Sequence, residues 1–116
     1  MTEAEIQNIL EKQHKFFQSG QTLPVNYRIE QLQKLKDSII RHEPDLNLAL
    51  KADLGKSETE SYMCEIGLTL SELSWMLTHI KKLTKEKWVP TPLAQFAARS
   101  FRSPSPYGTV LIMSPW

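Results

Sequence analysis

The sequence predicts a mainly helical chain that turns to extended structure near its end, as the first part of a larger α/β protein. Proline, which interrupts helices, is sparse before residue 89, where it stands only at Pro24 and Pro44. It then becomes frequent, at Pro90, Pro92, Pro104, Pro106 and Pro115. This change predicts helices over the first part of the chain and extended segments over the last.

The run 109–113 is the second observation behind this fold class. It is an apolar stretch, rich in β-branched residues, between Gly108 and Pro115, and it is typical of a strand buried on both faces of a parallel sheet. A parallel sheet needs further strands joined by crossovers, and none follow in the sequence. We therefore expect that the chain stops within a larger domain, and that most of its chemistry lies beyond Trp116.

Three helices are expected in the first half of the chain. The first covers about 2–19, with Thr2 as its N-cap and Gly20 as its stop. The second covers about 26–41, and the third covers about 44–53 with a proline in its first turn. Apolar residues at helical spacing should face inward from them: Ile6, Ile9, Leu10 and Phe17; Ile29, Leu32, Leu35 and Ile39; Leu46 and Leu50.

A fourth helix is expected to begin at Ser57, because Ser57-Glu58-Thr59-Glu60 is a capping-box sequence. Apolar residues then recur in steps of three and four along about five turns, and we call this row the seam. The seam consists of Met63, Ile66, Leu70, Leu73, Leu77 and Ile80. Packing inside the protein is the expected use of the seam. A partner chain is the alternative, and it motivates a rival hypothesis of a non-enzymatic helical protein-interaction module.

Two short strands are expected after the helices, at about 87–89 and 98–104, with 91–97 as their connection. Proline near both ends indicates an edge ribbon. A two-stranded ribbon is marginally stable alone, so a further sheet should support it.

Composition excludes several classes of protein. The 116 residues carry 14 basic and 13 acidic side chains, a net charge of +1, which gives no general attraction to nucleic acid or to anionic membranes. A single cysteine excludes an internal disulfide framework. The acidic start differs from a secretory signal, and no stretch approaches the roughly 20 apolar residues that span a bilayer. We expect a cytoplasmic protein with no nucleic-acid partner and no membrane segment.

Gly55-Lys56-Ser57 matches the end of a phosphate-binding loop, but Leu50 replaces the first glycine of that motif and a helix precedes it. We interpret Gly55 as a left-handed helix end and Ser57 as the cap of the next helix. Cys64 has no histidine at helical spacing. It is expected to be a buried small hydrophobic residue rather than a nucleophile.

The remaining candidate groups also have structural interpretations. No metal site is expected, because the histidines lack metal-ligand spacing; they are His14, His42 and His79. The basic cluster 81–87, joined by Arg99 and Arg102, is interpreted as a solvated helix end rather than a phosphate-binding patch.

Three sets of residues, taken in order, carry a family resemblance. They are Ala52-Asp53-Leu54-Gly55-Lys56-Ser57 with Glu65-Ile66-Gly67, then Thr91-Pro92-Leu93-Ala94-Gln95-Phe96, then Pro106-Tyr107-Gly108-Thr109-Val110-Leu111-Ile112-Met113-Ser114-Pro115-Trp116. Together they resemble the N-terminal region of an aldehyde dehydrogenase of the class 3-like branch. Their order and spacing extend over nearly the whole chain.

The resemblance implies an α/β parent with a Rossmann-like cofactor domain, which uses NAD or NADP to oxidise an aldehyde to a carboxylate. In the family, a cysteine thiolate attacks the carbonyl, hydride passes to the nicotinamide, and water hydrolyses the thioester with help from a glutamate. The cysteine N–H and an asparagine directly after the Ser-Pro-Trp motif stabilise the oxyanion. Cys64 does not match the nucleophile and the sequence ends at Trp116, so this chain alone should be inactive.

The resemblance also implies three parts. Residues 1–87 would be the N-terminal helical part of the cofactor-binding domain, residues 88–104 the β-ribbon of an oligomerisation domain that forms a homodimer, and residues 105–116 the start of the Rossmann-like domain. Ligands of open α/β sheets bind beyond the carboxyl ends of strands. The positions that line the cofactor cleft in the family correspond here to Met113, Ser114, Pro115 and Trp116.

Overall fold

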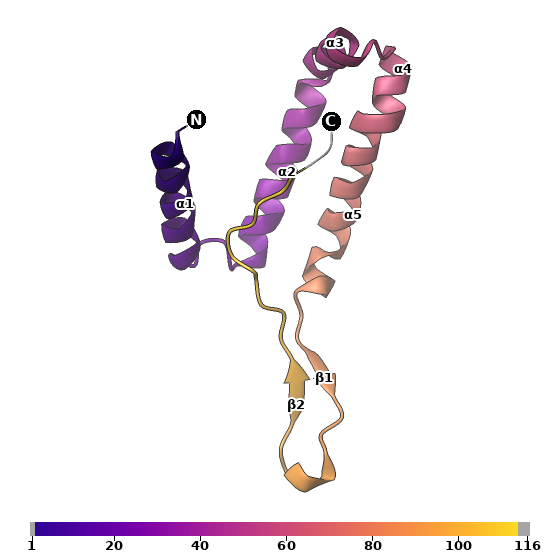
Figure 1. Cartoon of the computed structure of the whole chain (residues 1–116). Coiled ribbons are helices and arrows are strands. Elements are labelled where there is room, and N and C mark those ends of the chain that lie inside the picture. The colour runs from indigo at the N-terminus through magenta and orange to yellow at the C-terminus, as the bar shows by residue number, and fades with distance from the viewer. Residues whose placement is uncertain (1, 114–116) are drawn as a thin grey trace. The chain divides into compact units, whose positions relative to one another are not determined.

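The computed structural model describes residues 2–113, and these are mainly helical, as predicted (Figure 1). The helical elements are α1 (Glu3–Gln18), α2 (Val25–Arg41), α3 (Glu43–Leu54), α4 (Glu58–Ser61), the π-helical turn η1 (Tyr62–Ile66) and α5 (Gly67–Leu83). They are followed by β1 (Lys87–Val89), the 3-10 turn η2 (Leu93–Gln95) and β2 (Ser100–Arg102). Arg28–Lys82 forms one compact unit, and the described residues before and after it form another. No helix within residues 2–113 is long and apolar enough to cross a membrane.

The helix ends form where local side chains satisfy the backbone. Thr2 and Glu5 form a complete capping box: the Glu5 N–H donates to Thr2 Oγ1 over 3.3 Å, and the Glu5 carboxylate accepts from the Thr2 N–H over 2.7 Å. Ser57 Oγ accepts from the Glu60 N–H over 3.2 Å. Gly55 ends α3 in the left-handed conformation, at φ 68°. These predicted helix ends are confirmed.

Within the unit Arg28–Lys82, α2 and α5 lie side by side (Figure 1), and Lys36 Nζ donates to Ser74 Oγ over 2.9 Å. Three residues of the seam form the buried apolar core, namely Ile66, Leu73 and Ile80, at 4%, 9% and 6% exposure. The chain itself covers them. This burial favours internal packing as the use of this part of the seam.

The turn η1 interrupts the expected continuous seam. Its wide hydrogen bond runs from the Gly67 N–H to the Tyr62 carbonyl, five residues back. Ser61 and Ile66 are therefore both buried, five residues apart, while Met63 is exposed. The expectation that Met63 continues the buried row is wrong, because the extra residue in the turn shifts the helical phase. Gly67 is required here, since a Cβ would lie 2.7 Å from the Tyr62 carbonyl oxygen.

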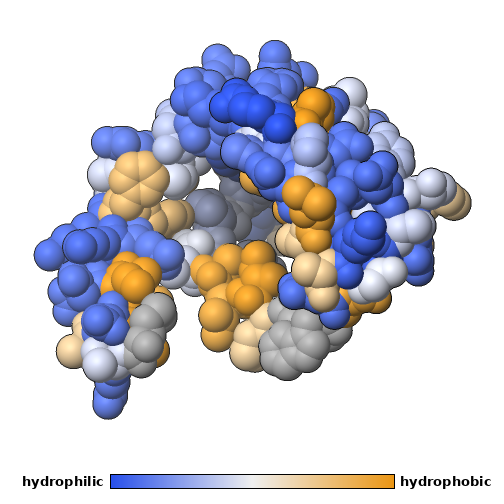
Figure 2. Space-filling view, turned by 90° about the horizontal axis from the view of Figure 1, so that it is seen from above, coloured by the Kyte–Doolittle hydropathy of each residue, from blue (hydrophilic) through white to orange (hydrophobic). Residues whose placement is uncertain are grey.

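The helices α1, α2 and α3 contain no buried residue, so their apolar rows are less covered than expected. Ile6, Ile9 and Leu10 of α1 keep more than two fifths of their surface exposed, at 42%, 43% and 43%. In the space-filling view, apolar side chains lie open at the surface among hydrophilic ones (Figure 2). An amphipathic helix buries its apolar row only where another layer covers it.

The predicted β-ribbon is confirmed, although its second strand is shorter than 98–104. β1 and β2 pair antiparallel, with Lys87 opposite Arg102, Trp88 opposite Phe101, and Val89 opposite Ser100. The Trp88 and Phe101 rings meet edge to face at 5.7 Å on one side of the ribbon. The cationic pair lies on the other side, because successive side chains alternate between faces.

The strand predicted over 109–113 is not formed in this structure, whereas the exposure of its apolar side chains agrees with a run that lacks a paired neighbour. Residues 109–113 form no strand, and their side chains are open, with Leu111 82% and Ile112 84% exposed. The physical reason is the lack of neighbours. The sheet in the described part of the chain contains only β1 and β2, and an extended segment cannot satisfy its own backbone groups as a helix does.

Candidate functional site

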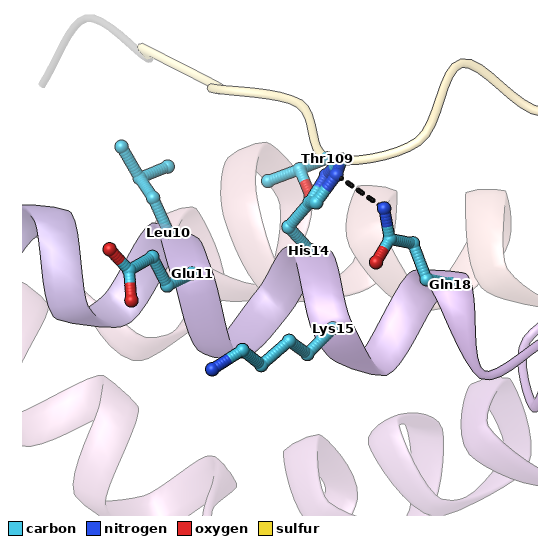
Figure 3. Close-up of a pocket in the computed structure, with 6 residues that line it drawn as sticks. All are labelled: Leu10, Glu11, His14, Lys15, Gln18 and Thr109. Atoms are coloured by element: carbon cyan, nitrogen blue, oxygen red, sulfur yellow. Dashed lines mark hydrogen bonds between the residues drawn. The ribbon is translucent and has the colours of Figure 1, made fainter.

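The extended segment that follows β2 meets α1 near Gly108. The φ of Gly108 is 95°, a conformation that favours glycine. A Cβ built at this position would lie 3.5 Å from the Phe17 ring, which is ordinary contact. Residues of α1 and Thr109 line a hollow of about 380 Å³ there (Figure 3): Leu10, Glu11, His14, Lys15, Gln18 and Thr109.

Among the polar residues that line this hollow, Gln18 and His14 are joined by a hydrogen bond between their side chains. The Gln18 amide nitrogen and His14 Nε2 are 2.8 Å apart (Figure 3). An amide nitrogen only donates, so this hydrogen bond requires a His14 Nε2 that carries no proton. No cysteine lines the hollow. It therefore shows no thiol nucleophile beside a base, and we assign it no reaction.

Of the four residues predicted to line a cofactor cleft, only Met113 lies within the described part of the chain. Met113 is the last described residue and is 85% exposed. Ser114, Pro115 and Trp116 lie outside the described residues. The cofactor role of all four positions therefore stays a prediction.

Cys64 is a free, exposed thiol, so the expectation that it is buried is wrong. It lies in η1, where Ser61 and Ile66 occupy the covered side of the helix. The phase shift of the π-helical turn places Cys64 away from that side. The helical spacing of the apolar residues does not predict such a turn.

Lys56 lies between α3 and α4 and forms an ion pair with Glu65 of η1. The hydrogen bond to Glu65 raises the pKa of Lys56 above the ordinary lysine value, while desolvation of the ammonium opposes this rise. This pairing supports the interpretation that Gly55-Lys56-Ser57 is a link between helices rather than a phosphate-binding loop. Sequence analysis missed the pair, since the two residues lie nine positions apart with a helix start between them.

Each histidine interacts with a side chain of its own helix or helix end. His42 Nδ1 lies 3.2 Å from Asp45 Oδ2, and the His79 ring stacks on Trp75 at 4.3 Å. Across residues 2–113, no group of three or more His, Cys, Asp or Glu side chains is arranged to hold a metal ion.

Part of the basic cluster is brought together by the ribbon. Lys85, Lys87 and Arg102 line one hollow of about 230 Å³ at its base. Arg99 is not among the lining residues. Lys81 and Lys82 instead occupy the last turn of α5, where cations stabilise a helix end.

The profile of the aldehyde dehydrogenase family matches residues 1–116. The chain belongs to the aldehyde dehydrogenase family. It is 44% identical to the 4,4'-diaponeurosporen-aldehyde dehydrogenase of Staphylococcus aureus, over 87% of this chain and 22% of that relative. It is 34% identical to a relative from Canis lupus familiaris named "Aldehyde dehydrogenase, dimeric NADP-preferring", over 97% of this chain and 25% of that relative.

Solved structures give the same result for this aldehyde dehydrogenase family member. A substrate-bound state of Staphylococcus aureus AldH matches it with a TM-score of 0.92 and 40% identity, over 96% of this chain and 24% of that one. Family 3 relatives include member H1 of Arabidopsis thaliana, 33% identical over 97% of this chain and 23% of that relative. The class 3-like resemblance is confirmed, and the chain spans about a quarter of the length of these relatives.

Proposed function

We propose that this chain is the N-terminal part of an enzyme that oxidises aldehydes to carboxylic acids with NAD or NADP, through a thioester on a cysteine. The observation that carries the proposal is the match to the substrate-bound aldehyde dehydrogenase, since 40% identity accompanies a TM-score of 0.92 over nearly the whole chain. Cys64 is not the proposed nucleophile, because it lies on an exposed helical turn and does not match the catalytic cysteine of the family. The chain by itself is therefore proposed to be inactive.

The proposed cofactor role rests on the segment that ends the described chain. The side chains of residues 110–113 are open to solvent, and their apolar character fits contact with the ring faces of a nucleotide. The nicotinamide cofactor supplies the hydride acceptor when it is bound. In the proposal, this chain excludes water from one edge of the cleft with Met113, Ser114, Pro115 and Trp116.

The proposed domain arrangement follows the family. Residues 1–87 belong to the helical part of a cofactor-binding domain, residues 105–116 begin its Rossmann-like α/β sheet, and residues 88–104 form the ribbon of an oligomerisation domain. The ribbon has apolar groups available for a homodimer contact, with Leu93 and Phe96 of the connection 92% and 91% exposed. We further propose a cytoplasmic location, which cell fractionation tests.

The rival hypothesis of a helical interaction module finds less support. Its motivation was a seam free for a partner, but Ile66, Leu73 and Ile80 are buried within this chain. Met63 remains exposed, yet one open residue does not make a docking row.

An activity assay tests the proposed function. The protein at its natural length, purified from its host, should produce reduced cofactor from NAD or NADP only when an aldehyde is present. The 116-residue chain should give no more than a control without protein. Gel filtration of the natural-length protein tests the homodimer. Loss of aldehyde dependence at natural length, or turnover by the short chain, would contradict the proposal.

A further inference from the structure

The base of the β-ribbon gathers cations that lie apart in the sequence. Lys85, Lys87 and Arg102 line one hollow, together with Leu83, Ser103 and Pro104. We propose that this hollow binds a phosphate group, carried either by a free small molecule or by a lipid headgroup. The proposal is independent of the proposed oxidation of aldehydes.

Strand register creates the site. Lys87 stands directly opposite Arg102 in the antiparallel pair. Side chains of directly opposed residues point to the same face, with Cβ atoms about 4.5–5.5 Å apart, and like charges placed so are destabilising. Lys85 contributes a third positive charge to the same hollow. The fold thus concentrates charge that an anion would neutralise.

In the described part of the chain, no carboxylate is seen paired with these three cations. The ion pairs Lys34–Glu30, His42–Asp45 and Lys56–Glu65 within residues 2–113 involve none of them. Glu86 lies between the two lysines in the sequence but does not line the hollow. An unneutralised cluster of this kind attracts anions more strongly than a single surface lysine does.

The donor set fits phosphate in particular. A guanidinium presents a planar fork of N–H donors that matches two phosphate oxygens, and lysine ammoniums add point charges. Ser103 adds a hydroxyl donor, while Leu83 and Pro104 give the hollow an apolar wall. The volume of about 230 Å³ is below the roughly 300–1,000 Å³ of pockets for larger ligands. The hollow therefore suits one phosphate group rather than a whole dinucleotide.

The structure changes the interpretation made from sequence. A solvated helix end accounts for Lys81 and Lys82, which lie in the last turn of α5. It does not account for Lys87, which lies in β1 beyond the helix. Pairing with β2 then adds Arg102, fifteen residues further along the chain.

Titration with inorganic phosphate tests the site in the protein at its natural length. Calorimetry should show saturable binding that sodium chloride at equal ionic strength does not reproduce. Arg102→Gln and Lys87→Gln should each weaken binding about tenfold, because each removes one charge-assisted contact. Arg99→Gln is the matched control, since it removes the same charge from a ribbon residue outside the hollow. It should bind phosphate as the wild type does.

Vesicles distinguish the two sources of phosphate. Cosedimentation with phosphatidylcholine vesicles that contain phosphatidic acid, lost in Arg102→Gln, supports a lipid headgroup. Binding of inorganic phosphate without cosedimentation supports a free ligand. The melting temperature distinguishes a loss of phosphate binding from a loss of folding. Arg102→Gln removes the repulsion between Arg102 and Lys87, so it should not lower the melting temperature in phosphate-free buffer.

Two results would overturn the proposal. One is that neither phosphate nor the phosphatidic acid vesicles bind beyond their chloride and phosphatidylcholine controls, as when carboxylates of a partner subunit neutralise the three cations. The other is that Arg99→Gln weakens binding as much as Arg102→Gln does.

Discussion

The helix that runs through η1 and α5 and the segment 103–113 are both rich in apolar residues, but only the helix buries them. Ile66 is 4% exposed and Ile112 is 84% exposed, although the two side chains are identical. A helix satisfies its backbone within itself and needs only one neighbour to cover its apolar face. An extended segment needs a hydrogen-bonding partner as well. The same composition therefore gives a core in one region and an open surface in the other.

The largest expected effect comes from emptying the helical core. Leu73→Ala should destabilise the 116-residue chain by about 2–4 kcal/mol, because it removes buried methyl groups and leaves a cavity. Leu68 on the same helix is 59% exposed, and Leu68→Ala should change stability by less than about 1 kcal/mol. Urea unfolding followed by circular dichroism measures both. Equal losses would show that α5 has no buried side.

The next effect concerns the π-helical turn. Alanine normally stabilises a helix interior relative to glycine by up to about 1 kcal/mol. Gly67→Ala should do the opposite and destabilise by about 1–3 kcal/mol, since its Cβ would lie 2.7 Å from the Tyr62 carbonyl oxygen. Ser71→Ala, at an exposed position of α5, is the control and should be neutral. A more stable Gly67→Ala variant in thermal melts would argue against the turn.

Loss of a helix cap should have a smaller effect. Ser57→Ala removes the acceptor for the Glu60 N–H and should destabilise by about 1 kcal/mol. Ser57→Asp keeps an acceptor at the same place, so it should recover most of the stability. Melting temperatures of the three proteins give the comparison, and a failure of aspartate to rescue would assign another role to Ser57.

The ion pair that links α3 to η1 predicts a pH dependence. The Glu65 hydrogen bond raises the pKa of Lys56 above its ordinary value of 10.5. Stability from this shift is fully present below the ordinary value and is lost as the pH rises through the raised pKa of the folded state. The melting-temperature difference between wild type and Lys56→Gln should therefore shrink in alkali. Lys51→Gln, at an exposed position of α3, is the control for loss of a lysine outside the Lys56–Glu65 pair.

The smallest expected effect lies in the extended segment. Leu111→Ser in the 116-residue chain should change the free energy of unfolding by less than about 0.5 kcal/mol, because Leu111 is 82% exposed. Self-association should decrease, since open apolar groups promote it. Sedimentation velocity measures the second effect. A loss of stability comparable with that of Leu73→Ala would show that the segment is packed.

The contrast between the two regions also explains what sequence could predict. The helix ends at Thr2, Gly55 and Ser57 were predicted because capping depends on residues three or four positions apart. The ribbon was predicted in place, although β2 is shorter than expected. Burial was predicted poorly, because it depends on neighbours that local patterns do not specify. The run 109–113 has the composition of a buried strand and none of the partners.

The candidate sites divide in the same way. The family resemblance of 105–116 came from a linear motif, which sequence carries directly. The exposure of Cys64 could not be anticipated, because it depends on one extra residue in a helical turn. The phosphate hollow depends on the register that sets Lys87 against Arg102, and register is a property of two strands together.

Because of the turn η1, the side chains at the start of the helix formed by η1 and α5 point in other directions than an uninterrupted α-helix would give them. An α-helix rotates by about 100° per residue. One additional residue in a turn therefore rotates the side chains that precede the turn by about that angle relative to the side chains that follow it. Met63 and Tyr62, which are exposed, therefore point in a different direction from the buried Leu73 and Ile80. The same helix therefore contributes buried side chains to the core along α5 and exposes Tyr62 and Met63 to solvent near its start.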